Sequence, residues 1–118
     1  MKDENQISTK SFQFAVRTVK LYQHLCTERK EFTLSKQLLR SGTSIGANIA
    51  ESQQAQSNAD FISKLSIALK ETSETKYWLR LMHATGYLTD KQADSMLADC
   101  SELEALLVAI LKKLKTKQ

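Results

Sequence analysis

The 118-residue sequence contains no proline and only three glycines. These two residue types most often interrupt helices, so their scarcity favours long, continuous helices. Strands are not indicated either, because no segment alternates apolar and polar residues with a period of two. The length is enough for one domain with a hydrophobic core, and too short for two.

Long apolar runs are also missing, and the longest extend over only a few residues. A helix that crosses a bilayer needs about 20, so no membrane span is expected. The first ten residues, MKDENQISTK, are polar and do not resemble a signal or transit peptide. Cys26 and Cys100 form no CxxC motif. We therefore expect a cytoplasmic protein whose reduced thiols pack as small core residues.

Four segments repeat apolar residues at steps of three and four, which is typical of amphipathic helices. The helices are predicted at about residues 9–29, 34–55, 58–86 and 90–115. The predicted core-facing residues of the first are Phe12, Ala15, Val19, Tyr22 and Cys26, and those of the second are Leu38, Ile45 and Ile49. Those of the third are Phe61, Leu65, Ala68, Thr72, Thr75, Leu79 and Met82, and those of the fourth are Met96, Cys100, Leu103, Leu107, Ile110 and Leu114. Short connections between long helices predict an all-α, up-down-up-down antiparallel four-helix bundle.

Residues at the segment ends support these boundaries. Residues 57–60 (SNAD) and 89–92 (TDKQ) have the form of capping boxes, in which a hydroxyl and an acid or amide satisfy the first N–H groups of a helix. Thr33 is the predicted N-cap of the second helix, and Gly86 the predicted stop of the third.

The run RSGTSIGANIAE, residues 40–51, is the most unusual stretch. Its glycines lack the spacing and the preceding strand of a phosphate-binding loop. Gly42, Gly46 and Ala50 are instead spaced i, i+4 and i+8, so they share one face of a helix and predict a close approach by a neighbouring helix. Arg40 lies on another side of this helix. Antiparallel pairing with the third helix predicts an ion pair between Arg40 and Glu71 or Glu74, and the alternative is that all three are solvated.

The third helix carries a second apolar stripe beside its core-facing residues. Ile67, Trp78 and Leu81 belong to this stripe, and we interpret them as a contact between subunits. The alternative is that Trp78 completes the core, because wide apolar faces are normal in bundles.

Catalytic and metal-binding patterns are not found. The Glu-x-x-His motif of di-iron bundles is missing, since Leu21 precedes His24 and Arg80 precedes His83 at the required position. Glu71 and Glu74 are explained by the ion pair with Arg40. We therefore expect no enzyme activity and no cofactor.

Basic residues indicate a nucleic-acid partner. The net charge is +4, and lysines and arginines lie away from the predicted core faces. Such residues can contact a phosphate backbone, although most lysine-rich helix ends are merely solvated. The candidate nucleic-acid-binding residues are Lys10, Arg17, Lys20, Lys76, Arg80, Lys112, Lys113 and Lys115.

Two longer runs carry a family resemblance. LLRSGTSIGANIAES and SNADFISKLSIALKETSETKYWLRLMHATGYL resemble the four-helix bundle proteins encoded in intervening sequences of bacterial 23S ribosomal RNA genes. The matching positions are Arg40, Ser44, Ile45, Asn48, Ile49, Ala50, Glu51, Phe61, Leu65, Ala68, Glu74 and Leu79. Ser52 departs from the pattern, because family members often carry a glycine there.

The resemblance implies a ring-shaped assembly, typically a homopentamer. It also implies kinship with the accessory variability determinant of diversity-generating retroelements, a basic bundle that binds nucleic acid and a reverse transcriptase. We therefore expect a non-enzymatic oligomer that associates with RNA, or with a ribonucleoprotein or reverse-transcriptase partner. The alternative is a protein-binding adaptor or scaffold with no nucleic-acid role.

Overall fold

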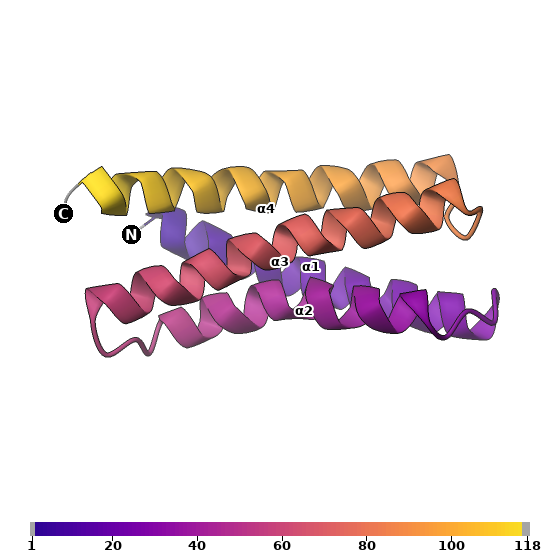
Figure 1. Ribbon diagram of the computed structural model, residues 1–118, viewed down its shortest axis with the longest axis horizontal. Helices are drawn as coiled ribbons and strands as arrows, with labels where there is room; N and C mark the ends of the chain where they lie inside the picture. The colour runs from indigo at the N-terminus through magenta and orange to yellow at the C-terminus, as the bar shows by residue number, and fades with distance from the viewer. Residues whose placement is uncertain (1, 117–118) are drawn as a thin grey trace.

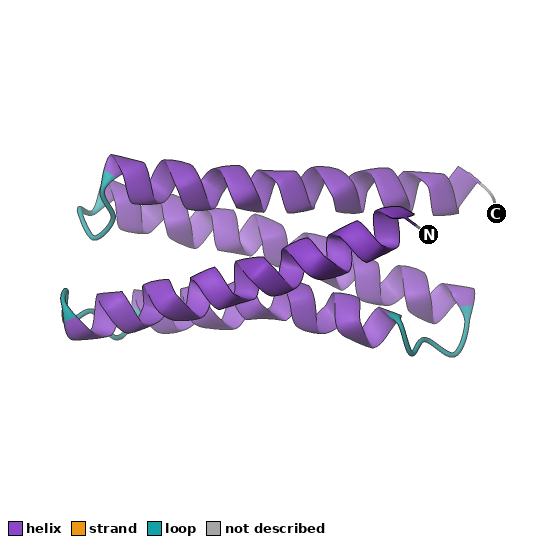
Figure 2. Ribbon diagram, turned by 180° about the vertical axis from the view of Figure 1, so that it is seen from behind, coloured by secondary structure: helices purple, strands orange, loops and turns teal. Residues whose placement is uncertain are grey.

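The computed structural model describes residues 2–116, with side chains from Asn5 onward. These residues form four helices, α1 (Lys2–Thr27), α2 (Leu34–Ser52), α3 (Asn58–Ala84) and α4 (Asp90–Thr116). Helices α1 and α3 each pack against α2 and α4, which makes a rod of 47 × 22 × 19 Å. The chain begins and ends at the same end of the rod (Figure 1), and the loops lie only at its two ends (Figure 2). The predicted up-down-up-down bundle is confirmed.

The core runs along the axis of the bundle. The predicted core-facing residues of α3 and α4 are buried, except that Phe61 and Leu114, near the helix ends, are partly exposed. Leu38, Ile45 and Ile49 of α2 are buried against them, as predicted. These three helices therefore follow the 3–4 periodicity of their sequences closely.

Hydroxyl side chains share this core with the apolar residues. Thr72 Oγ1 donates to the Leu69 carbonyl at 2.6 Å, and Thr75 Oγ1 donates to the Glu71 carbonyl at 2.7 Å. Thr75 Oγ1 also lies 3.0 Å from Ser41 Oγ across the α2–α3 contact. Among the described residues, no buried side-chain polar atom lacks a hydrogen-bond partner. The buried hydroxyl groups of Thr72 and Thr75 are therefore accommodated by hydrogen bonds inside the bundle.

Helix α1 differs from its prediction in both start and orientation. It begins at Lys2, not near residue 9, and its buried residues are Ile7, Ser11, Phe14, Thr18 and Leu25. The predicted core-facing residues Phe12 and Val19 are 70% and 37% exposed. Both stripes of α1 have helical spacing, and the one that contains two small hydroxyl residues is buried because it faces the glycines of α2. The interpretation of Phe12 and Val19 as core residues was wrong.

The helix ends agree with most of the predicted caps. Thr89 and Gln92 bond each other's backbone N–H groups at 3.1 and 2.9 Å, which is a reciprocal capping box. Ser57 Oγ accepts from the N–H of Asp60 at 3.0 Å. Gly86 follows α3 with φ of +85°, a conformation that favours glycine and ends the helix.

The N-terminus of α2 is capped differently from the prediction. Thr33 makes no side-chain cap, and the carboxylate of Glu31 accepts from the N–H groups of Thr33, Leu34 and Ser35 at 2.7–3.2 Å. Burial opposes ionisation of Glu31, but these hydrogen bonds outweigh it and lower the pKa of the carboxyl group below its ordinary value. The loop before α2 therefore supplies the cap as a buried, charged side chain.

Candidate functional site

The two glycines of the 40–51 run lie where α2 crosses α1. A methyl group at Gly42 would lie 2.6 Å from Thr18 Cγ2 and 2.8 Å from Thr18 Oγ1. At Gly46 it would lie 3.2 Å from the carbonyl oxygen of Ser11. Both positions are therefore in close contact with α1. Ala50, the third residue of this row, is exposed and does not take part in the close contact.

Arg40 lies on the α3 side of α2. Its guanidinium is 3.5 Å from Glu71 Oε1 through Nη1, and Nη2 pairs with Glu74. The same Glu74 carboxylate accepts from the indole N–H of Trp78 at 3.0 Å. Glu71 is buried, whereas the Arg40 side chain is half exposed. This cluster joins α2 to α3.

The stripe that sequence analysis assigned to a subunit contact is only partly exposed. Ile67 is 36% exposed, while Trp78 and Leu81 are intermediate and Trp78 packs against the core. Trp78 also meets Tyr77 edge to face, with the ring centroids 5.1 Å apart. The apolar surface on this side of α3 is therefore small, and Tyr77, at 55% exposed, is its most open member.

A larger exposed apolar surface lies between α1 and α2. Phe12 and Val16 of α1 are 70% and 39% exposed, and with Val19 they form a stripe along the helix. A groove beside this stripe is lined by Phe12, Ala15, Thr43, Ala47 and Ala50, among other residues. We call this surface the α1/α2 groove. Sequence analysis missed it because it assigned Phe12 and Val19 to the core.

The candidate nucleic-acid-binding residues Lys10, Arg17 and Lys76 form ion pairs within the bundle. Lys10 lies 3.0 Å from Glu102, and Arg17 pairs with Asp99; both pairs join α1 to α4. Lys76 on α3 lies 3.0 Å from Glu104 on α4. The residues that join these helices are Lys10, Arg17, Lys76, Asp99, Glu102 and Glu104. A phosphate would have to displace a carboxylate to bind Lys10, Arg17 or Lys76.

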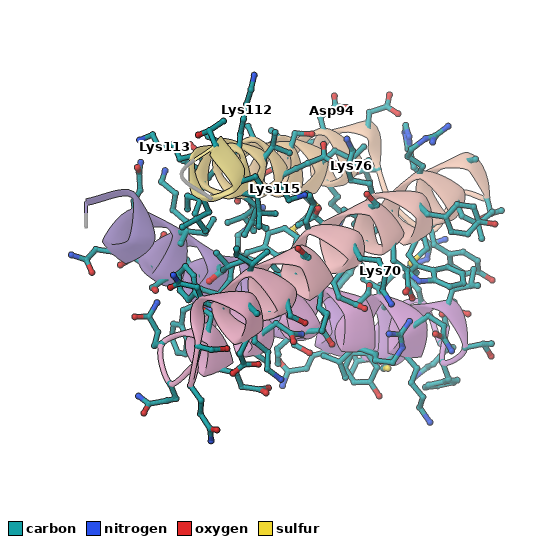
Figure 3. The ribbon with its side chains drawn as sticks, turned by 60° about the vertical axis from the view of Figure 1, so that its left-hand side comes forward. Lys70, Lys76, Asp94, Lys112, Lys113 and Lys115 are labelled. Carbon is teal, nitrogen blue, oxygen red and sulfur yellow. The ribbon has the colours of Figure 1, made fainter. Side chains whose placement is uncertain are left out.

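The other candidates fall into two groups. Lys20 and Arg80 are exposed on α1 and α3. Lys112, Lys113 and Lys115 are exposed on the last turns of α4 and fan out around the end of the helix (Figure 3). Lys117 lies outside the described residues.

The net formal charge of the sequence falls in its last 14 residues. Residues 105–118 contain four of the 17 basic residues and none of the 13 acidic residues. Residues 1–104 therefore carry 13 basic and 13 acidic side chains and have no net charge. The whole formal charge of +4 belongs to the C-terminal 14 residues.

The histidines and cysteines do not gather into a site. His83 Nε2 lies 2.7 Å from Asp90, and His24 is exposed on α1. Within residues 2–116, no group of three or more His, Cys, Asp and Glu side chains could hold a metal ion. Cys100 is buried, and burial is the main cause that raises the pKa of its thiol to about 12. Cys26 is partly exposed.

Comparison with known proteins identifies the family. Residues 3–109 match the family model of the 23S rRNA-intervening sequence protein. The chain belongs to this family. A crystal structure described as a protein of unknown function from the S23 ribosomal protein family of Bacteroides thetaiotaomicron VPI-5482 is 56% identical, with a TM-score of 0.92. The match covers 93% of this chain and 98% of that one. A search of curated proteins gave no match.

The 40–51 run contributes to the centre of the bundle. Ile45 and Ile49 are buried in the core, and Arg40 joins α2 to α3. Asn48 Nδ2 donates to the Ser44 carbonyl at 2.8 Å and so stays within its own helix. Within the described part of the chain, no helix combines the length and apolar character needed to cross a bilayer.

Proposed function

We propose that this intervening-sequence protein is a non-enzymatic homo-oligomer that associates with RNA through the C-terminal end of α4. One observation carries the proposal: the entire net charge lies in residues 105–118, which include the exposed Lys112, Lys113 and Lys115 of the last turns of α4. A phosphate backbone is attracted to such a cluster, because neutralising phosphates releases condensed counterions. An oligomer brings several copies of the cluster together and strengthens the local field.

The family resemblance supports the same proposal. The retroelement accessory variability determinant is a basic, pentameric bundle of the same kind, so we propose a pentamer here as well. A reverse transcriptase or another ribonucleoprotein component is then the protein partner of this class. Lys10, Arg17 and Lys76 each pair with a carboxylate of α4, so RNA would have to displace that carboxylate to bind them.

The second candidate function is a protein-binding adaptor. The α1/α2 groove favours it, because exposed apolar surface of this kind marks protein contacts. Lysines near the end of a helix also stabilise its C-terminal dipole, so their position can be explained without RNA. RNA association requires the lysines near the end of α4, whereas an adaptor that binds protein through the α1/α2 groove does not.

Fluorescence anisotropy with a labelled single-stranded RNA separates them. The double variant K113Q/K115Q is compared with K70Q/K91Q, which removes the same charge from exposed lysines on α3 and at the start of α4. We expect the first variant to weaken binding at least tenfold more than the second. Equal losses in both variants would mean that only the overall charge matters. No binding by the wild type would leave the adaptor function.

A further inference from the structure

The connection between α2 and α3 is polar but uncharged. Residues 52–59 read SQQAQSNA, so they contain four carboxamide side chains, two hydroxyl side chains and no charged residue. This connection lies at the same end of the rod as the C-terminal end of α4 (Figure 1). It therefore occupies the end of the bundle that carries the exposed lysines of α4.

A hollow lies between this connection and the last turns of α4. Its volume is about 510 Å³, which is within the range of roughly 300–1,000 Å³ for ligand sites. We call it the α2–α3 hollow, and its lining includes Gln53, Gln56, Ser57, Asn58, Phe61 and Leu114. Phe61 and Leu114 pack against the core and are partly exposed, so they give the hollow two apolar walls.

Two of the lining amides are available to a ligand. Gln56 and Asn58 are exposed, and neither side chain makes a hydrogen bond to another described residue. By contrast, Gln53 Nε2 donates to Ser8 Oγ at 3.4 Å, and Ser57 Oγ caps α3. A carboxamide has both donor hydrogens and an acceptor oxygen. Gln56 and Asn58 can therefore both donate to a bound group and accept from it.

The α2–α3 hollow suits a neutral polar group better than a phosphate. Among the described residues, those that line it include no lysine or arginine. The carboxylate of Asp60 accepts from the Gln56 N–H at 3.3 Å, so it occupies the N-terminal end of α3, where a helix would otherwise attract an anion. A phosphate inside the hollow would meet this negative charge with no cation beside it.

Cations lie next to the hollow on its α4 side. Leu114 lines the hollow, and the exposed Lys113 and Lys115 precede and follow it in the sequence. Successive residues of a helix point about 100° apart, so these lysines leave α4 on either side of Leu114. Figure 3 shows both at this end of α4. A nucleotide combines a neutral base with a charged phosphate, and these two parts match the hollow and the lysines beside it.

We infer that the α2–α3 hollow receives one unpaired base of an RNA strand whose phosphates contact Lys113 and Lys115. Gln56 and Asn58 bond the polar edge of the base, and Phe61 offers an aromatic face for stacking. Duplex RNA does not fit, because its bases are already paired and stacked. The inference rests on the proposed RNA association and adds a preference for single strands at the same site.

Fluorescence anisotropy with two labelled strands tests the base contact. One strand is a single-stranded RNA, and the other is an abasic strand of the same length and charge. We expect the wild type to bind the RNA roughly fivefold or more tightly than the abasic strand. Q56A/N58A should lose most of this preference, and its salt dependence should stay unchanged because no phosphate contact is removed. F61L keeps an apolar side chain but removes the aromatic face, so it should lower the preference as well.

Q13A/Q23A is the matched control, because it removes two exposed amides of α1 that lie outside the hollow. It should bind both strands as the wild type does, and circular dichroism checks the fold of every variant. Equal affinity of the wild type for the two strands, or a preference that either hollow variant leaves unchanged, would overturn the inference and leave RNA association through the lysines standing. No binding of either strand by the wild type would overturn both.

Discussion

The α1–α2 crossing makes the sharpest stability prediction. Alanine at Gly42 would place its methyl group 2.6 Å from Thr18 Cγ2, and the Thr18 side chain is fully buried. Overpacking of this kind costs about 1–3 kcal/mol. The gain in helix propensity from glycine to alanine returns about 1 kcal/mol. We therefore expect G42A to destabilise the bundle by roughly 1 kcal/mol, although alanine is the better helix former.

A double-mutant cycle isolates the contact. T18A alone should destabilise the bundle by about 1–2 kcal/mol, because it leaves a small cavity. In G42A/T18A the new methyl group fills part of that cavity, so the coupling should favour the double variant by about 1–2 kcal/mol. Urea unfolding followed by circular dichroism, at one protein concentration, gives the four stabilities. Additive effects to within about 0.5 kcal/mol would refute the close contact between these residues.

Three further predictions concern the cap, the ion pair and the thiols. Because hydrogen bonds lower the pKa of Glu31, its stabilisation is complete above the unfolded value of about 4.3 and is lost as pH falls through the folded value. E31Q should therefore cost about 0.5–2 kcal/mol near neutrality and progressively less in acid, and a pH-independent cost in urea unfolding would contradict this. The half-exposed pair of Arg40 with Glu74 should show a coupling of only about 0.2–1 kcal/mol in an R40A/E74A cycle, and a much larger value would contradict a surface pair. In thiol labelling at pH 8, Cys26 should react in the folded protein and Cys100 only after unfolding, whereas equal rates would contradict the burial of Cys100.

Helices α3 and α4 could be predicted closely because in each the core-facing residues recur at steps of three and four along nearly the whole helix. Helix α1 has two apolar stripes, one through Phe14 and one through Phe12, and periodicity alone favours neither. The choice depends on α2, where Gly42 and Gly46 accept the small side chains of Thr18 and Ser11 at close range. The large residues of the other stripe remain exposed.

For the candidate site too, contacts between adjacent helices could be predicted, whereas contacts that depend on how distant helices pack could not. The proximity of Arg40 to Glu71 and Glu74 could be predicted, because it depends only on an antiparallel turn between adjacent helices. The pairing of Lys10 with Glu102 depends on the register of α1 against α4, which are 92 residues apart in the sequence at this contact. The local sequence pattern of neither helix predicts that register. The cap of α2 was missed because a buried acid in the preceding loop replaces the hydroxyl of Thr33.

The salt dependence of RNA binding tests the central claim most directly. A single-stranded RNA is titrated with the wild-type protein between about 50 and 200 mM salt. If four phosphates are contacted, the slope of about −0.7 per phosphate corresponds to a roughly 50-fold loss of affinity over this range. We predict a loss of this size, and a shallower slope for K113Q/K115Q than for K70Q/K91Q. Affinity that is unchanged by salt, or no binding at about 50 mM, would contradict an RNA-associating bundle.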